Sequence, residues 1–247
     1  MTSFLDLPSE IRNSVYELCL LQQSPINPFD EYYPGSGLTP GVLRVNRQIY
    51  REASSFMYAQ NIFDLSWVSH KEVASFLERI GRTNAGCIQH IYIDFPDFGN
   101  LEAGNITLED ASSDVCANIQ SNCANLRTLT MPPDSTTTVL LKLEALDHPK
   151  VAIEALELIN GRLRAISSLE DIVAQVYDDG PSGYLKKAME SHGWTVREVE
   201  YYEEEDWGRS RSPVDDYDDD RDYNYDEEEE YDYDIDNDSD FWRRAGD

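Results

Sequence analysis

Short apolar runs alternate with helical patterns over most of this chain, and the alternation limits its fold more than any other feature. The runs combine β-branched and aromatic residues at a spacing of two, which suits a pleated strand; they are residues 61–67, 87–95, 125–131, 169–177 and 194–202. The intervals between them carry apolar residues at helical spacing. Strands that alternate with helices form parallel sheets through right-handed crossovers. We therefore predict an α/β protein with a mainly parallel sheet.

Each interval offers an apolar helical face to cover the sheet. The predicted core residues are Val73, Phe76, Leu77 and Ile80, then Val115, Ile119 and Cys123, then Val139, Leu140, Leu143 and Leu146, then Ala155, Leu156, Ile159 and Leu163, and finally Tyr184, Leu185, Ala188 and Met189. Successive strand starts lie about 25 to 44 residues apart, around the repeat length of solenoid proteins. This spacing favours an open, irregular leucine-rich-repeat-like stack, and a compact doubly wound sheet is the alternative.

Ahead of the strands, two amphipathic helices are predicted. The first runs from about Pro8 to Leu18, because proline suits the first turn of a helix and apolar residues recur behind it at helical spacing. A short strand is expected at Cys19–Gln22, followed by an exposed loop rich in proline and glycine. The second helix is predicted from about Gly41 to Ala59. Its expected buried face is Val42, Val45, Ile49, Ala53 and Phe56.

The second helix also carries a basic stripe, defined here as Arg44, Arg47 and Arg51. The spacing places these arginines on a face away from the predicted core. Such a stripe is usually solvated or paired with acidic side chains, and the alternative is a partner site. It stands out because the rest of the chain is acidic.

These two helices carry a resemblance to a known family. LPSEIRN at residues 7–13 resembles the first helix of an F-box, and LRVNRQIYREASSFMYAQNIFDLS at 43–66 is similar to the companion motif of a large group of fungal F-box-like proteins. An ordinary F-box joins its first two helices tightly, whereas residues 22–40 separate them here. The resemblance covers roughly residues 4–66 and extends more loosely to the strands and helices behind them.

The resemblance implies a non-enzymatic protein-interaction module. Its first helix would dock on the adaptor subunit of a cullin-RING ubiquitin ligase, through Leu7, Pro8, Ile11, Val15 and Leu18. The repeats would hold a substrate, so that the protein acts as a substrate-recognition or scaffold subunit. From the residues alone, the apolar stripe has another fate, which is packing against the second helix within the same chain. Internal packing is the commoner fate, because apolar stripes of this size are rarely left exposed.

The end of the chain is a polyanion. Residues 198–247 hold about 23 acidic and 5 basic side chains, with tyrosines between them and without aliphatic periodicity. Such a segment buries too little apolar surface to offset its chain entropy, so we expect residues 203–247 to be disordered. Ser212, next to Pro213 and Arg211, is a candidate phosphorylation site. We therefore divide the chain into an F-box-like region at 1–66, a continuous strand-helix region at 67–202 and an acidic tail at 203–247.

The tail supports an alternative function, that of an acidic-tailed binding protein or chaperone for basic proteins such as histones. A further alternative is that the tail folds back on the basic stripe. The formal net charge of -28 makes direct binding to nucleic acid unfavourable, because phosphate binding needs clustered lysine and arginine. No run approaches the length of about 20 apolar residues that a membrane span needs.

The sequence contains no motif typical of catalysis or of metal or cofactor binding. The histidines are isolated, the four cysteines lack the spacing of a zinc or redox site, and no phosphate-binding loop or nucleophile motif occurs. Buried, reduced thiols are expected, which fits the cytoplasm or nucleus. We thus expect no catalytic residue, metal or cofactor; the partner that the resemblance implies is a protein.

Overall fold

The computed structural model describes residues 3–29, 38–177 and 180–200. In this part of the chain, five parallel strands form one sheet in the order β1-β2-β5-β6-β7. Their bounds are β1 Ile62–Asp64, β2 His90–Tyr92, β5 Thr128–Met131, β6 Asp171–Tyr177 and β7 Thr195–Val199. Each lies inside one of the predicted runs. The predicted α/β class with a mainly parallel sheet is confirmed.

The order of the strands follows the order of the chain. A doubly wound sheet starts near its middle and is extended in both directions, which a sequential order excludes. Right-handed crossovers between successive neighbours place their helices on one face of the sheet. The open, repeat-like arrangement is therefore the one that the protein adopts.

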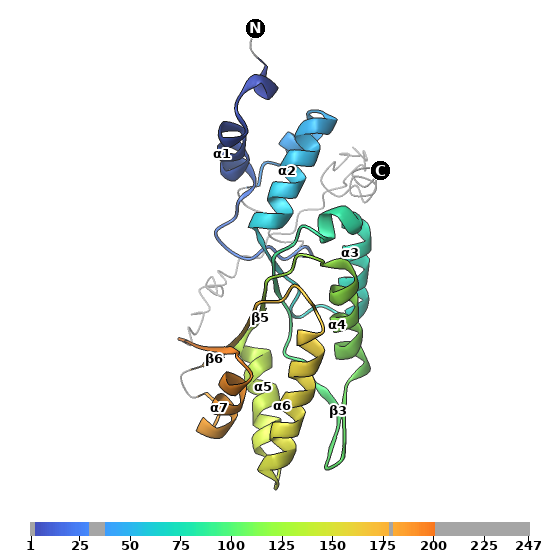
Figure 1. Cartoon of the computed structure of the whole chain (residues 1–247), viewed down its shortest axis with the longest axis vertical. Helices are drawn as coiled ribbons and strands as arrows, with labels where there is room; N and C mark the ends of the chain where they lie inside the picture. The colour runs from blue at the N-terminus through green and yellow to red at the C-terminus, as the bar shows by residue number, and fades with distance from the viewer. Residues whose placement is uncertain (1–2, 30–37, 178–179, 201–247) are drawn as a thin grey trace, which may run out of the picture.

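Five helices cover that face (Figure 1). They are α3 His70–Ala85, α4 Asp110–Asn122, α5 Pro133–Glu144, α6 Pro149–Arg164 and α7 Gly183–Ser191. The predicted core residues of these helices are buried or pack half-buried against the core. Gly81 has a φ of 75° and kinks α3, which then continues for one more turn. Thus the apolar spacing located both the helices and their inner faces.

In the described residues ahead of the sheet there are two α-helices and two short 3₁₀ helices: η1 Phe4–Asp6, α1 Ser9–Leu20, η2 Pro40–Arg44 and α2 Arg47–Gln60. Figure 1 shows α1 and α2 side by side at one end of the molecule, with α5 and α6 toward the other. The core is continuous between these ends. It runs from Tyr16 and Leu20 through the strands to Leu185 and Met189.

The second predicted helix is interrupted, which corrects the prediction of one helix from Gly41. Asn46 is extended, with φ -164° and ψ 170°, and its side-chain oxygen accepts hydrogen bonds from the N–H groups of Gln48 and Ile49 at 2.9 and 3.0 Å. Asparagine favours this N-cap role because it satisfies donors that lack a partner in the first turn. A new helix therefore starts at Arg47. Val45, predicted to be buried, is 62% exposed.

Two further differences concern strands. The strand expected at Cys19–Gln22 is wrong, because Cys19 and Leu20 end α1; instead Ile26 forms a parallel bridge with Phe63 at the edge of the sheet. An antiparallel hairpin of β3 Phe98–Glu102 and β4 Asn105–Leu108 was not predicted. It interrupts the crossover between β2 and α4 and packs beside α6 (Figure 1). Its residues lack strong alternation and turn at Gly104, whose φ is 78°.

The acidic tail, Ser212 and residues 30–37 of the proline-rich loop lie outside the described residues. Among the helices that are described, none is long and apolar enough to cross a membrane.

Candidate docking surface

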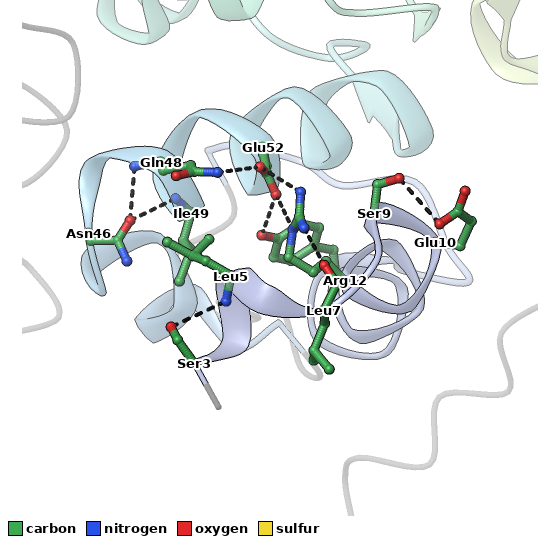
Figure 2. Close-up of polar contacts among 11 residues, drawn as sticks. Ser3, Leu5, Leu7, Ser9, Glu10, Arg12, Asn46, Gln48, Ile49 and Glu52 are labelled. Carbon is green, nitrogen blue, oxygen red and sulfur yellow. Dashed lines mark hydrogen bonds and ion pairs between the residues drawn. The ribbon is translucent and has the colours of Figure 1, made fainter. Parts of the chain in front are cut away.

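A charged network fixes α1 against α2. Arg12 donates two hydrogen bonds to the Glu52 carboxylate, from Nε at 2.7 Å and from Nη2 at 2.9 Å, and a third from Nη1 to the Leu7 carbonyl at 2.6 Å (Figure 2). Glu52 also accepts from Tyr16 at 3.1 Å and Gln48 at 3.2 Å. The hydrogen bonds from Arg12 lower the pKa of Glu52. The pKa of Tyr16 is raised by the burial of its side chain and, to a smaller extent, by its hydrogen bond to Glu52. The bidentate geometry sets the orientation of α1 about its axis.

Asn61 joins the other ends of the two helices. Its side-chain amide donates to the carbonyls of Leu20 at 2.7 Å and Met57 at 2.9 Å, and its oxygen accepts from the Gln22 N–H at 2.8 Å. Asn61 is 2% exposed. These bonds satisfy backbone groups where α1 ends, which water would otherwise have to reach. Asn61 therefore holds α1, α2 and the start of β1 together.

Aromatic packing completes the contact between the helices. Tyr16 is fully buried and its ring lies 5.9 Å from that of Phe4 and 6.3 Å from that of Phe56, measured between centroids. Leu20, one turn further along α1, is also fully buried. At about 100° per residue, Arg12, Tyr16 and Leu20 share one side of the helix. This is the side by which α1 packs.

The apolar stripe of α1 lies on another side. We define the α1 apolar face as Leu7, Ile11, Val15 and Leu18. Leu7 is 37% exposed, Ile11 51% and Leu18 84%, whereas Val15 is half-buried. Pro8, next to Leu7 in the sequence, is also exposed. The Leu7 side chain points away from α2 in Figure 2. The expectation that this stripe packs internally is wrong. The helix packs instead through a second apolar side, formed by Tyr16 and Leu20, which do not belong to the stripe. Arg12 holds this second side against α2 through its hydrogen bonds to Glu52.

Exposed apolar residues are concentrated in the N-terminal helical region. Of the eight large hydrophobic residues that are exposed in the described chain, five belong to the N-terminal helical region, since Leu21 and Val45 add to Leu7, Ile11 and Leu18. Exposed apolar residues are normal when scattered, whereas a contiguous group marks an interaction site. Ile11 and Leu18, which are seven residues apart, thus share one accessible side of a firmly held helix, and Leu7 is exposed just before its first turn.

The basic stripe lies on α2 and the turn before it. Arg44, Arg47 and Arg51 are all exposed, as predicted for a face away from the core. Arg47 and Arg51 are one turn apart at the start of α2, and their side chains make no ion pair with any residue that the structure describes.

The sheet has a second face, away from the helices, that we did not predict as a functional surface. On it His90 Nε2 lies 2.9 Å from Thr130 Oγ1, and the His90 and Tyr92 rings are 5.4 Å apart. Burial, with a smaller contribution from the charge of Arg197, lowers the pKa of His90. Val173 is buried on this face without joining the main core. In the sequence, this face could have been located from the residues at alternate positions of the predicted strands, which point away from the core.

Trp67 marks the carboxyl end of β1. It is 70% exposed and has a φ of 61°, a left-handed conformation that is uncommon for residues other than glycine. Its N–H donates to Asp94 Oδ2, beyond the end of β2, at 3.0 Å, and burial raises the pKa of Asp94. A large aromatic side chain is thus presented to solvent at the carboxyl end of β1.

The described residues offer little for metal or thiol chemistry. No group of three or more histidine, cysteine, aspartate or glutamate side chains among them could hold a metal ion. All four cysteines carry free thiols, and Cys116 and Cys123 are buried. Burial raises the pKa of Cys116 to about 11 and that of Cys123 to about 12, so both stay protonated at neutral pH.

Comparisons with known proteins identify no relative. No family model, no curated protein and no solved structure matches the chain.

Proposed function

We propose that this protein is a non-enzymatic protein-interaction module of the F-box-like kind. In this proposal the α1 apolar face docks on the adaptor subunit of a cullin-RING ubiquitin ligase, and the strand-helix stack holds a substrate protein. The observation that carries it is the exposure of Leu7, Ile11 and Leu18 on one side of α1 while the helix is anchored by another. The resemblance of residues 7–13 and 43–66 to F-box-like sequences names the partner.

Energetics favour this use of α1. Full burial of a leucine or isoleucine side chain contributes about 1.5 to 3 kcal/mol, so Ile11 and Leu18 could supply a substantial part of a docking free energy. Binding costs less when the docking element is already ordered. Arg12, Glu52 and Asn61 hold α1 in place beforehand. A partner would therefore gain apolar burial with little loss of conformational entropy.

The substrate side of the proposal rests on the second face of the sheet. Tyr92 and His90 line it, and Trp67 stands at its carboxyl edge with an exposed ring. Tyrosine and tryptophan are enriched among the residues that dominate protein-protein binding energy. In this proposal the second face of the sheet holds the substrate while the α1 apolar face engages the adaptor. The proposed location is the cytoplasm or nucleus, where free thiols persist.

Binding of the purified adaptor to the full chain tests the docking proposal. Ile11→Asp and Leu18→Asp should each weaken binding at least tenfold in isothermal titration calorimetry, because a buried anchor is replaced by a charge that must lose its water. Leu141→Asp is the matched control, since Leu141 is 59% exposed on α5 and far along the chain. It should bind like the unmodified protein.

Circular dichroism would show that all three variants are folded. Absence of adaptor binding by the folded, unmodified chain would refute the ligase proposal. Equal binding by Ile11→Asp and the unmodified chain would show that a different surface meets the adaptor.

A further inference from the structure

Two arginines of the basic stripe, Arg47 and Arg51, have no acidic partner within the described part of the chain. Arg47 and Arg51 are exposed at neighbouring turns of α2, and neither forms an ion pair with a described residue. Glu52 is the acidic residue nearest to them along the helix, and its carboxylate is already held by Arg12, Tyr16 and Gln48. Two guanidinium groups therefore stand together on a surface without local neutralisation, in a chain whose net charge is -28.

The chain itself contains a segment of matching chemistry. Residues 215–240 hold 16 acidic residues, a single basic residue, Arg221, and 5 tyrosines. Carboxylates can pair with guanidinium groups in bidentate geometry, and tyrosine rings can stack on their planar faces. An arginine pair is better suited than lysines to bind such a mixed acidic and aromatic segment.

We propose that residues 215–240 dock on the basic stripe of the same molecule. The described chain ends beyond β7, which is at the opposite edge of the sheet from β1, and α2 leads directly into β1. Four strand spacings amount to about 19 Å. The 27 residues that follow Glu200, up to Glu227, would span roughly 29 Å on average as a flexible coil and could extend to about 90 Å. The acidic segment can therefore reach the stripe.

Attachment to the same chain makes the contact feasible even though each ion pair is weak. Exposed ion pairs contribute little individually and are screened by salt over about 8 Å at physiological ionic strength. A tethered segment is present at an effective concentration on the order of millimolar, and many carboxylates can exchange at the same arginines. The docked state should thus be dynamic, salt-sensitive and independent of protein concentration.

Amide hydrogen exchange of α2 in the full chain tests the proposal. The unmodified protein is compared with a full-length variant in which the acidic residues of 215–240 are replaced by asparagine and glutamine. At 50 mM NaCl, exchange in peptides covering α2 should be about fivefold slower in the unmodified protein, which corresponds to a few weak surface ion pairs. The difference should vanish at 500 mM NaCl and in Arg47→Glu/Arg51→Glu. Equal exchange rates of α2 in the unmodified protein and in the variant with the neutral tail would overturn the proposal.

Controls separate the basic stripe from a general charge effect. Lys150→Glu/Arg162→Glu reverses two exposed basic residues on α6 and should leave the protection of α2 intact. Loss of protection in this control would show that overall charge, rather than the stripe, holds the tail. Tenfold dilution should not change the exchange rates. A dependence on concentration would assign the contact to a second copy and refute docking within one molecule.

Discussion

At the scale of single residues, Asn46 and Asn61 fix the two ends of α2 within residues 43–66, the segment that resembles F-box-like sequences. Asn46 caps α2, and this cap ends η2 and sets where the new helix starts. Asn61 ties three elements together, while Tyr58 stacks on Phe63 with ring centroids 5.5 Å apart. The two asparagines bond backbone groups at the ends of α2 that apolar packing cannot satisfy.

Asn61→Ala should destabilise the protein by about 2 to 4 kcal/mol, because it removes the three hydrogen bonds of a buried side chain. The Leu20 carbonyl and the Gln22 N–H would each lose the partner that Asn61 provides. Urea unfolding followed by circular dichroism measures the change. The comparison variant is Asn13→Ala, at an exposed position on α1, which should stay within about 0.5 kcal/mol of the unmodified protein. A similarly small effect for Asn61→Ala would contradict its structural role.

At the scale of elements, α1 shows that an apolar stripe in a sequence does not by itself reveal which side of a helix is buried. Two adjacent apolar sides compete on this helix. The buried side contains Arg12, Tyr16 and Leu20, and its polar members conceal it from a search for hydrophobic spacing. The choice between the sides depends on Glu52, which is 40 residues away from Arg12 in sequence.

Leu18→Ala and Leu20→Ala make a matched pair on this helix. Leu20→Ala should lower the free energy of unfolding by about 2 to 5 kcal/mol through the cavity that it leaves, whereas Leu18→Ala should change it by less than about 0.5 kcal/mol. The residues are 0% and 84% exposed, respectively. Thermal unfolding under identical conditions gives both values. A larger loss for Leu18→Ala than for Leu20→Ala would mean that α1 is rotated from the orientation described.

Elements with a regular apolar spacing could be predicted from the sequence, together with the side that each of them buries. All five parallel strands and the inner faces of α3 to α7 were predictable, because strands such as Asp171–Tyr177 and helices such as Pro149–Arg164 must bury one side wherever they pack. The β3-β4 hairpin was not, since its inward residues Leu101 and Ile106 are only partly buried. For the candidate site, the residues of the α1 apolar face were predictable and their exposure was not.

At the scale of the whole molecule, the sequential sheet resembles a repeat array, but its core is shared from end to end. Arrays of weakly coupled repeats can lose cooperativity, whereas a continuous core favours unfolding as a unit. Here Leu20, near the amino-terminal end, and Leu185 on α7 are both fully buried in the same cluster. The boundary that the sequence suggests near residue 66 falls inside this core.

We therefore expect a single unfolding transition for residues 1–202, in which damage at either end is felt throughout. Leu20→Ala and Leu185→Ala should each shift the urea midpoint, and far-UV circular dichroism and tryptophan fluorescence should give coincident curves for both variants. Leu141→Ala, at an exposed position, serves as the control and should not move the midpoint. Two separate transitions, with the first affected by Leu20→Ala and unaffected by Leu185→Ala, would show instead that the N-terminal helices unfold independently of the sheet. Their docking surface would then be free to change shape without disturbing the strand-helix stack.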